Sequence, residues 1–463
     1  MLGDLLPIWS VIPFVGILLS IALCPLINAH WWEHNMSKVS LFWAAAFIIP
    51  FSLAFGLNDG LYQLLHIYVM DYIPFIILLF SLFVIAGGIL VRGTLQGTPL
   101  FNMLLLAVGA VLANIVGTTG ASIVLVRPLI RALECRRAKV HTIVFFIFIV
   151  SNIAGSLTPV GDPPLFLGYL HGVPFFWTLK LLPIFLLNVT LLLATYYWLD
   201  LRQYKKERLD SGSEVARLEN NKDLCDKEPI RISGLTNLLF LGGVIFAVVF
   251  GGEIAKHPLF YDAAHNALKG VPLISSHGHT LVWPYRNMIW DTFILCMALL
   301  SLKLTPKSLR ATNSFSWAPI KEVAVLFAGI FSTIIPALAI LSAKGAQLGV
   351  TEPWQFFWAA GLLSSFLDNA PTYLTFLALG GQMNATVGIA TDMGMLSERV
   401  LWAISCGSVF MGANTYIGNA PNFMVRSIAE EAGIRMPSFF GYMGWSIAVL
   451  IPLFLLNTAL FFR

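Results

Sequence analysis

Apolar stretches long enough to cross a bilayer recur along almost the whole chain, with short polar connections between them. A helix needs about 20 mainly apolar residues to span the hydrocarbon core. Such stretches lie near residues 8–28, 39–57, 72–91, 140–170, 181–200, 235–251, 287–302, 320–341, 400–430 and 440–462. The pattern predicts an all-α polytopic membrane protein with about 10–11 spans.

Two further apolar segments, 99–131 and 353–381, are interrupted in the middle by polar residues. Each has an apolar arm, a polar tip and a second apolar arm. Counting the spans places both ends of the first segment on one face and both ends of the second on the other. We therefore expect two re-entrant helical hairpins with tips near mid-membrane, where irregular backbone is tolerated only inside protein or beside a wet cavity.

The stretches 140–170 and 400–430 have the length of full spans but contain glycine, proline and polar residues at their centres. The first contains "SLTPVGDPP" and the second "ANTYIGNAPN". A helix broken at this point leaves free carbonyls at one end and free N–H groups at the next. These groups suit cations and anions respectively, so both stretches are predicted to be discontinuous transmembrane helices.

The hairpin and the broken helix occur in the same order in both halves of the chain, which indicates an internal repeat. Interrupted segments at matching positions are typical of secondary transporters, and the span count makes the two repeats inverted. The predicted units are 1–70 (N-terminal helices), 71–200 (first inverted repeat), 201–233 (cytoplasmic linker), 234–316 (connecting helices with an outer loop) and 317–463 (second inverted repeat).

Composition and charge support a membrane protein and exclude several functions. Hydrophobic residues make up 57% of the chain and charged residues 11%, against about 25% charged in soluble domains. The basic clusters around 127–139, 202–208 and 303–310 flank spans, which predicts a cytoplasmic position for them and an outer position for both termini. They do not indicate nucleic-acid binding. The HExxH, GxSxG and GxxxxGK[ST] motifs do not occur, so no enzyme and no cofactor is predicted.

Oxygen-bearing side chains at the tips and breaks are the candidate ligands for an ion or substrate, because hard cations such as sodium prefer such oxygens. Asp162 and Asp368 are the candidate sodium or proton ligands, since a carboxylate inside the bilayer is costly unless it serves a function. The alternative is that both aspartates only cap half-helices. The full candidate set is Asn114, Thr118, Thr119, Ser151, Asn152, Thr158, Asp162, Asp368, Asn369, Thr372, Asn414, Thr415, Asn419 and Asn422.

The motifs "PVGDPP", "DNAP" and Gly-Asn-x-Pro-Asn together resemble the ion transporter superfamily, in its sodium/proton antiporter and citrate permease-like branch. The resemblance covers about residues 70 to 460. It implies two inverted repeats, frequent homodimers and an elevator-like motion. It also implies two ion sites, one formed by Asn114, Thr118, Thr119 and Asp162, the other by Asp368, Asn369, Thr372 and Asn419. Neither hairpin tip has the Ser-Asn-Thr of the dicarboxylate carriers.

Two functions follow from these observations. The first is sodium:proton antiport, in which Asp162 and Asp368 alternately hold sodium and protons; it predicts that Asp368→Asn abolishes exchange in a protein that still folds. The alternative is sodium- or proton-coupled transport of an organic anion such as citrate or a dicarboxylate. Arsenite efflux is a third option on family grounds alone. We expect a multi-pass protein of the bacterial inner membrane, whose partners are its substrate, the lipid bilayer and a second copy in a homodimer.

Overall fold

The computed structural model describes residues 2–92, 97–134, 136–210, 231–254, 257–262, 267–313, 315–383 and 385–463. The first-half helices are α1 (Leu2–Leu5), α2 (Ile12–Ile27), α3 (Ala29–Phe55), α4 (Leu57–Ile67), α5 (Ile73–Ala86), α6 (Pro99–Ala132), α7 (Val140–Ile149), α8 (Pro163–Leu170) and α9 (Leu182–Asp210). The second-half helices are α11 (Thr236–Glu253), α12 (Tyr285–Leu304), α13 (Lys307–Thr312), α14 (Ala318–Lys344), α15 (Pro353–Phe366), α16 (Asn369–Gly381), α17 (Glu398–Met411), α18 (Ala420–Glu431) and α19 (Phe439–Phe461).

The remaining elements are short. A π-helix (Tyr68–Tyr72) joins α4 to α5, and 3₁₀ turns occupy Ile8–Val11, Ile153–Leu157, Phe175–Leu181, Gly345–Leu348 and Gly412–Asn414. The strands pair as four antiparallel ribbons: β1 (Leu90–Arg92) with β2 (Arg231–Ser233), β3 (Tyr261–Asp262) with β4 (Ala267–Leu268), β5 (Gly270–Ser276) with β6 (His279–Pro284), and β7 (Ile389–Thr391) with β8 (Gly394–Leu396). Among the described residues, nine helical stretches are long and apolar enough to cross a membrane. The all-α polytopic fold is thus confirmed.

The segment 99–131 is a hairpin, as predicted. α6 is interrupted only at Gly117, which has a positive φ of 79° that L side chains rarely adopt. Its two ends meet, because Arg136 donates from Nη1 to the carbonyl of Gly97 at 2.8 Å, and a Cβ on Gly109 would lie 3.1 Å from Leu125 of the opposite arm. One residue therefore turns the chain back at the tip.

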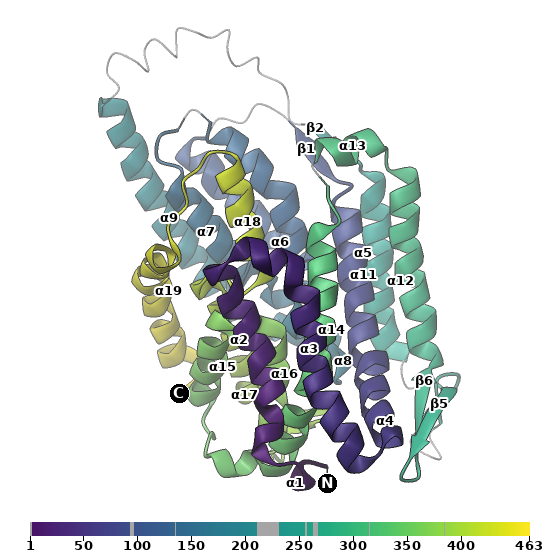
Figure 1. Ribbon diagram of the computed structural model, residues 1–463. Coiled ribbons are helices and arrows are strands. Elements are labelled where there is room, and N and C mark those ends of the chain that lie inside the picture. The colour runs from purple at the N-terminus through teal and green to yellow at the C-terminus, as the bar shows by residue number, and fades with distance from the viewer. Residues whose placement is uncertain are drawn as a thin grey trace.

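The segment 353–381 is the second hairpin, formed by α15 and α16 with a break at Leu367 and Asp368. Its arms pack together, since the rings of Phe356 and Phe376 have centroids 6.5 Å apart. The two hairpins open toward opposite ends of the molecule: α6 begins and ends near β1, whereas α15 begins near the C-terminus (Figure 1). The inverted arrangement of the repeats follows from this geometry.

Both discontinuous helices break at a pair of glycines six residues apart. A Cβ on Gly161 would lie 2.3 Å from the carbonyl oxygen of Gly155, and a Cβ on Gly418 would lie 2.5 Å from that of Gly412. Only glycine allows the backbone to approach itself so closely. Proline then stands in the first turn of both α8 and α18, where its missing N–H costs no helical hydrogen bond.

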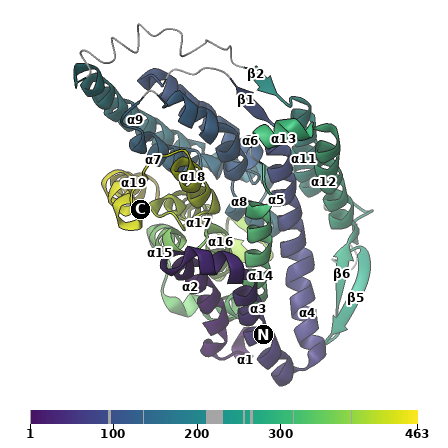
Figure 2. The same cartoon turned by 45° about the horizontal axis from the view of Figure 1, so that its top comes forward.

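The helices that precede each hairpin exchange partners between the halves. α2 and α3 of the first half pack on α14, whereas α11 and α12 of the second half pack on α5. In both views α4, α5, α11 and α12 lie on one side of the molecule, and α9 and α19 on the other (Figures 1 and 2). The hairpins and broken helices therefore lie between two sets of long helices.

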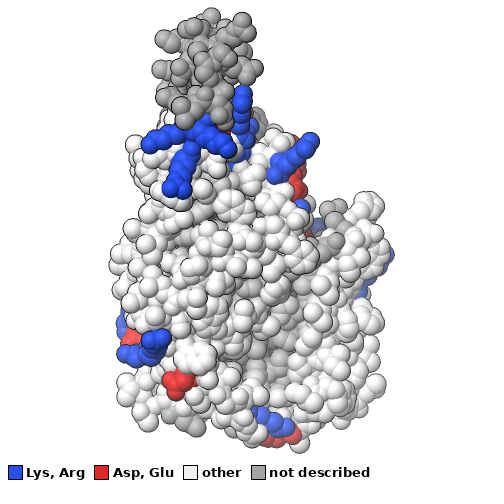
Figure 3. Space-filling view, turned by 90° about the vertical axis from the view of Figure 1, so that its left-hand side faces the viewer, with Lys and Arg blue, Asp and Glu red and all other residues white. Residues whose placement is uncertain are grey.

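The structure separates the two termini from the ends of the helices that carry the basic clusters, and which of these ends is cytoplasmic stays a prediction. Both termini and the β5–β6 ribbon lie at one end, while β1, β2, α13 and the end of α9 lie at the other (Figure 1). Over most of the face in Figure 3, charged side chains gather near the two ends, with a broad uncharged band between them. The unit boundaries given above stay a prediction, and residues 211–230 of the proposed linker lie outside the described residues.

Candidate functional site

Asp162 lies at the centre of the molecule, at the start of α8, and is 1% exposed. Thr118, next to the kink of the first hairpin, donates from Oγ1 to Asp162 Oδ1 at 2.7 Å. Asn369, at the tip of the second hairpin, donates from Nδ2 to Oδ2 at 2.5 Å, and Asn419 donates to Oδ1 at 3.3 Å. The carboxylate thus joins both hairpins and both broken helices.

Asn419 occupies in the second half the position that Asp162 occupies in the first. Each residue follows the second glycine of its break, Gly161 or Gly418, and takes the N-cap position of the next half-helix in extended backbone. Neither makes a capping bond with its side chain. The two side chains instead face one another across the repeat boundary, so the repeat is symmetric in shape but carries a carboxylate in one half and an amide in the other.

Amide side chains continue the network from Asn419 into the two breaks. Its Nδ2 also lies 3.2 Å from Ser151 O and from Asn152 Oδ1. Asn152 in turn donates to Asn422 Oδ1 at 2.6 Å, and Asn422 donates to the carbonyls of Gly412 and Thr415 at 2.8 and 2.9 Å. Asn152 also donates to the carbonyl of Ile147 at 2.8 Å, so all three asparagines bond backbone carbonyls at the breaks.

Asp368 has a different role from Asp162. Its Oδ1 accepts from the backbone N–H of Ala370 at 3.1 Å, so it caps α16. Thr372 donates to the carbonyl of Asp368 at 3.0 Å inside the same helix. Asp368 therefore caps a half-helix, as the alternative reading proposed. Among the described residues, the Asp162 carboxylate accepts hydrogen bonds only from side chains and does not cap α8.

Equivalent threonines tie each break to the first arm of the hairpin in the same repeat. Thr158 donates to the carbonyl of Asn114 at 2.6 Å, and the Asn114 side chain accepts from Leu157 N at 2.8 Å. In the second half Thr415 donates to the carbonyl of Ser365 at 2.5 Å. Hairpin and broken helix are therefore fixed to one another within each repeat.

The remaining candidates lie around this centre. Ser151 Oγ is 2.9 Å from Ser122 Oγ on the first hairpin, Asn414 donates to Ser365 Oγ at 2.9 Å, and Thr119 is half-buried beside Thr118. Sequence reasoning missed Ser122 and Ser365. The signal for Ser365 was present, because "SSFLDNAP" puts two hydroxyls in an apolar arm just before the tip.

The two sets of residues implied by the resemblance are mixed in the structure. Thr118 and Asp162 came from the first proposed site, Asn369 and Asn419 from the second, and all four meet at one carboxylate. Asn114 instead faces the break. The tips and breaks therefore form one continuous polar centre.

Several buried oxygens of this centre have no hydrogen-bond partner among the described residues. They are Asn369 Oδ1, Asn414 Oδ1, Ser156 Oγ and Ser408 Oγ. A buried polar atom without a partner costs about 1–3 kcal/mol, so such oxygens are suited to an ion or a substrate hydroxyl. Three half-helices, α8, α16 and α18, also begin here, and the positive ends of their dipoles stabilise negative charge.

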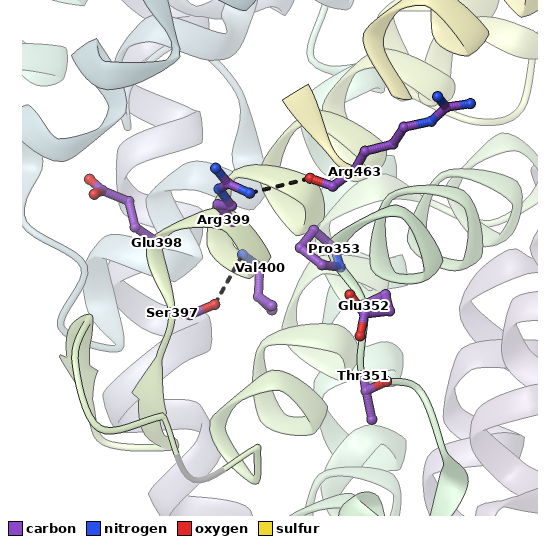
Figure 4. Close-up of a pocket in the computed structure, with 8 residues that line it drawn as sticks. All are labelled: Thr351, Glu352, Pro353, Ser397, Glu398, Arg399, Val400 and Arg463. Carbon is purple, nitrogen blue, oxygen red and sulfur yellow. Dashed lines mark hydrogen bonds between the residues drawn. The ribbon is translucent and has the colours of Figure 1, made fainter. Parts of the chain in front are cut away.

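A pocket of about 390 Å³ lies at the start of the second hairpin, at the end away from its tip (Figure 4). It is lined by the starts of α15 and α17, and Arg399 reaches across it to the carbonyl of Arg463 at 3.2 Å. At the foot of the first hairpin the matching arginine, Arg136, is buried and bonds Asp200 at 2.6 Å and Glu207 at 2.7 Å. Both arginines therefore hold helix ends together at the base of a hairpin.

Two inverted repeats with crossed hairpins and broken helices around a polar centre define a secondary transporter fold. The chain matches a family model described as "Putative citrate transport" over residues 3–462, and it belongs to that family. This places it among transporters and in the citrate permease-like branch that the motifs resembled.

Two curated relatives carry names of a transporter and of a membrane protein. An uncharacterized transporter of Mycobacterium tuberculosis (strain H37Rv) is 26% identical over 352 residues, covering 73% of this chain and 71% of the relative. A 46 kDa membrane protein of Mycobacterium leprae is 24% identical over 371 residues, covering 77% and 75%. The chain is therefore a multi-pass membrane transporter.

Proposed function

We propose that the protein transports an organic anion such as citrate, coupled to protons or sodium, across the bacterial inner membrane. The observation that carries the proposal is the Asp162 carboxylate, which is buried and contacted only by neutral donors within the described part of the chain. The family description supports this alternative over sodium:proton antiport, the first of the two sequence hypotheses.

A buried carboxylate without a cationic partner is costly, and several kcal/mol are recovered when an ion neutralises it. A proton or sodium ion bound at Asp162 supplies that neutralisation. For sodium, the free Asn369 Oδ1 beside the carboxylate is a further ligand of the kind hard cations prefer. The loaded centre then crosses the membrane without an uncompensated charge on the protein.

The carboxylates of the substrate need donors and positive potential. The first turns of α16 and α18 supply the positive ends of helix dipoles. Arg426, on α18 beyond the break, lies 4.6 Å over the ring of Tyr416 and pairs with Glu430 at 2.9 Å. It is the cation on α18 that stands nearest in sequence to the break.

Counterflow in proteoliposomes tests the proposal. Vesicles loaded with unlabelled citrate and diluted into labelled citrate should accumulate label transiently, and an inward proton or sodium gradient should then drive net uptake. A protein that shows neither, although it is folded and correctly inserted, would overturn the proposal.

Sodium:proton antiport is kept as the second candidate because two aspartates, Asp162 and Asp368, stand at the centre. Vesicles with an acid interior and no organic anion test it directly. Dissipation of the pH gradient by external sodium or lithium, and not by potassium, would establish exchange. We expect the pH gradient to remain unchanged in this assay, and we expect citrate counterflow in the other.

A further inference from the structure

A second titratable cluster lies away from the polar centre, at the end of α8. His171 follows the last residue of α8 and is 8% exposed. Its Nδ1 lies 3.0 and 2.9 Å from the two carboxylate oxygens of Asp392, and its Nε2 lies 3.2 Å from Asp71 Oδ1. One imidazole is thus held between two carboxylates.

The two carboxylates belong to different parts of the fold. Asp392 lies in the turn between β7 and β8, which connects the second hairpin to α17, and its backbone N–H also bonds the carbonyl of His171 at 3.2 Å. Asp71 lies in the π-helix between α4 and α5. π-helical turns are rare and often occur at functional sites.

The π-helix is fixed to the long helices around it. The hydroxyls of Tyr68 and Tyr72 donate to the carbonyls of Ala328 and Ala324 on α14, at 3.0 and 2.9 Å. Asp71 therefore belongs to the set of α4, α5 and α14, whereas His171 ends the half-helix that begins at Asp162. The contact between Asp71 and His171 must break if α8 moves relative to α5.

We propose that His171 is a proton-binding site, and that the bound proton holds α8 against the π-helix in the arrangement seen here, which we call the closed state. An imidazolium between two carboxylates completes an ion-pair triad. A neutral imidazole has only one N–H and cannot serve both carboxylates. The proton thus decides whether both contacts exist together.

The direction of the pH effect follows from the charges. Burial opposes the charged imidazole, but the negative charges of Asp71 and Asp392 outweigh it and raise the pKa of His171 from 6.5 to about 10. When the contact opens, the pKa returns toward its ordinary value and the proton leaves at neutral pH. The closed state is therefore fully stabilised below about pH 6.5, and it loses about tenfold in its equilibrium constant per pH unit above that, until about pH 10.

The first experiment measures the proton itself, on full-length protein with ¹⁵N-labelled histidine in lipid nanodiscs. The chain has nine histidines, and the signal that His171→Gln removes identifies this one. We expect its imidazole to titrate near pH 10. When Asp71 and Asp392 are both asparagine, we expect its pKa to fall below its ordinary value, because burial then acts without the two negative charges. Titration near pH 6.5 in the unchanged protein would overturn the proposal.

The second experiment measures opening by hydrogen exchange of the backbone amides of α8 and the π-helix. His277→Gln is the matched control, because His277 pairs with Asp59 at 2.9 Å but is 81% exposed. At each pH below 9 we expect several-fold faster exchange in His171→Gln than in this control. Equal protection of these amides against exchange in the two variants would refute the proposal. Neither experiment requires citrate. Both results can therefore be interpreted even if the protein does not transport citrate.

Discussion

Replacing Asp162 by asparagine is the sharpest test of how the polar centre works. The change removes the charge and leaves the shape. Three donors now reach the carboxylate, from Thr118, Asn369 and Asn419. An amide offers one oxygen and one NH₂ group. Either Asn369 turns its unpartnered Oδ1 toward the new NH₂ group, or one of the two asparagine donors loses its acceptor.

The cost of this change to the fold is modest. An unpaired buried donor costs about 1–3 kcal/mol, and removal of a buried, unpaired charge offsets part of that. The net change in the free energy of unfolding is therefore expected to stay below about 3 kcal/mol. Coupling, in contrast, should be lost, because an amide can bind neither a proton nor sodium with comparable affinity. We expect at least about a 100-fold fall in gradient-driven citrate uptake, equivalent to about 2.7 kcal/mol.

Asp368→Asn is the matched control. Asp368 caps α16 through its bond to Ala370 N, and asparagine caps helices equally well. Uptake by this variant should remain within about threefold of the unchanged protein, because only a cap is replaced by an equivalent cap. The assay is gradient-driven uptake of labelled citrate into proteoliposomes, normalised to folded protein measured by gel filtration and thermal unfolding.

Two results would refute the reasoning. If Asp162→Asn retained uptake driven by the pH or sodium gradient, the carboxylate would not be the coupling group. If Asp368→Asn abolished transport while Asp162→Asn did not, the roles inferred from their hydrogen bonds would be reversed. If both variants lost transport and the unchanged protein exchanged sodium for protons, sodium:proton antiport would again be the better hypothesis.

Other predictions concern the scaffold of the site. Gly418→Ala should prevent correct folding, because its Cβ would lie 2.5 Å from the carbonyl oxygen of Gly412, while Gly444→Ala, which meets nothing within 4 Å, should be neutral by thermal unfolding in detergent. Arg136→Met should destabilise by about 3–5 kcal/mol, because it removes the guanidinium from the buried Asp200 and leaves that carboxylate with His141 and neutral donors. A second change, Asp200→Asn, should recover part of that loss in a double-mutant cycle measured by chemical denaturation.

Much of the fold could be predicted from the sequence, because hydrophobic length and glycine–proline interruptions are local signals. The hairpin at 99–131 and the break at Gly161 follow from such signals. Asn114 shows the limit, since it was predicted as a ligand at the tips and breaks, whereas the helix continues through it and turns at Gly117. The sequence locates an interruption of a helix to within a few residues. The residue at which the chain turns depends on the backbone segments that pack against it, which the sequence does not show.

The grouping of the site residues could not be predicted from the sequence. Asp162 and Asn369 are 207 positions apart and belong to different repeats, so only the crossing of the repeats brings them within hydrogen-bonding distance. The different roles of Asp162 and Asp368 were also hidden. Both are aspartates beside a break, and only the direction of each side chain separates a cap from a buried charge.

The broken helices have an electrical consequence. α7 has 10 residues and α8 has eight, which at about 1.5 Å per residue makes half-helices of about 15 and 12 Å. Each covers about half of a hydrocarbon core of about 30 Å. The polar centre at the break therefore lies near the middle of the core, and an ion that reaches it from either face crosses about half of the membrane potential. A net charge carried across the whole membrane is worth about 2.3 kcal/mol per 100 mV, so transport that is not electroneutral should respond steeply to membrane potential.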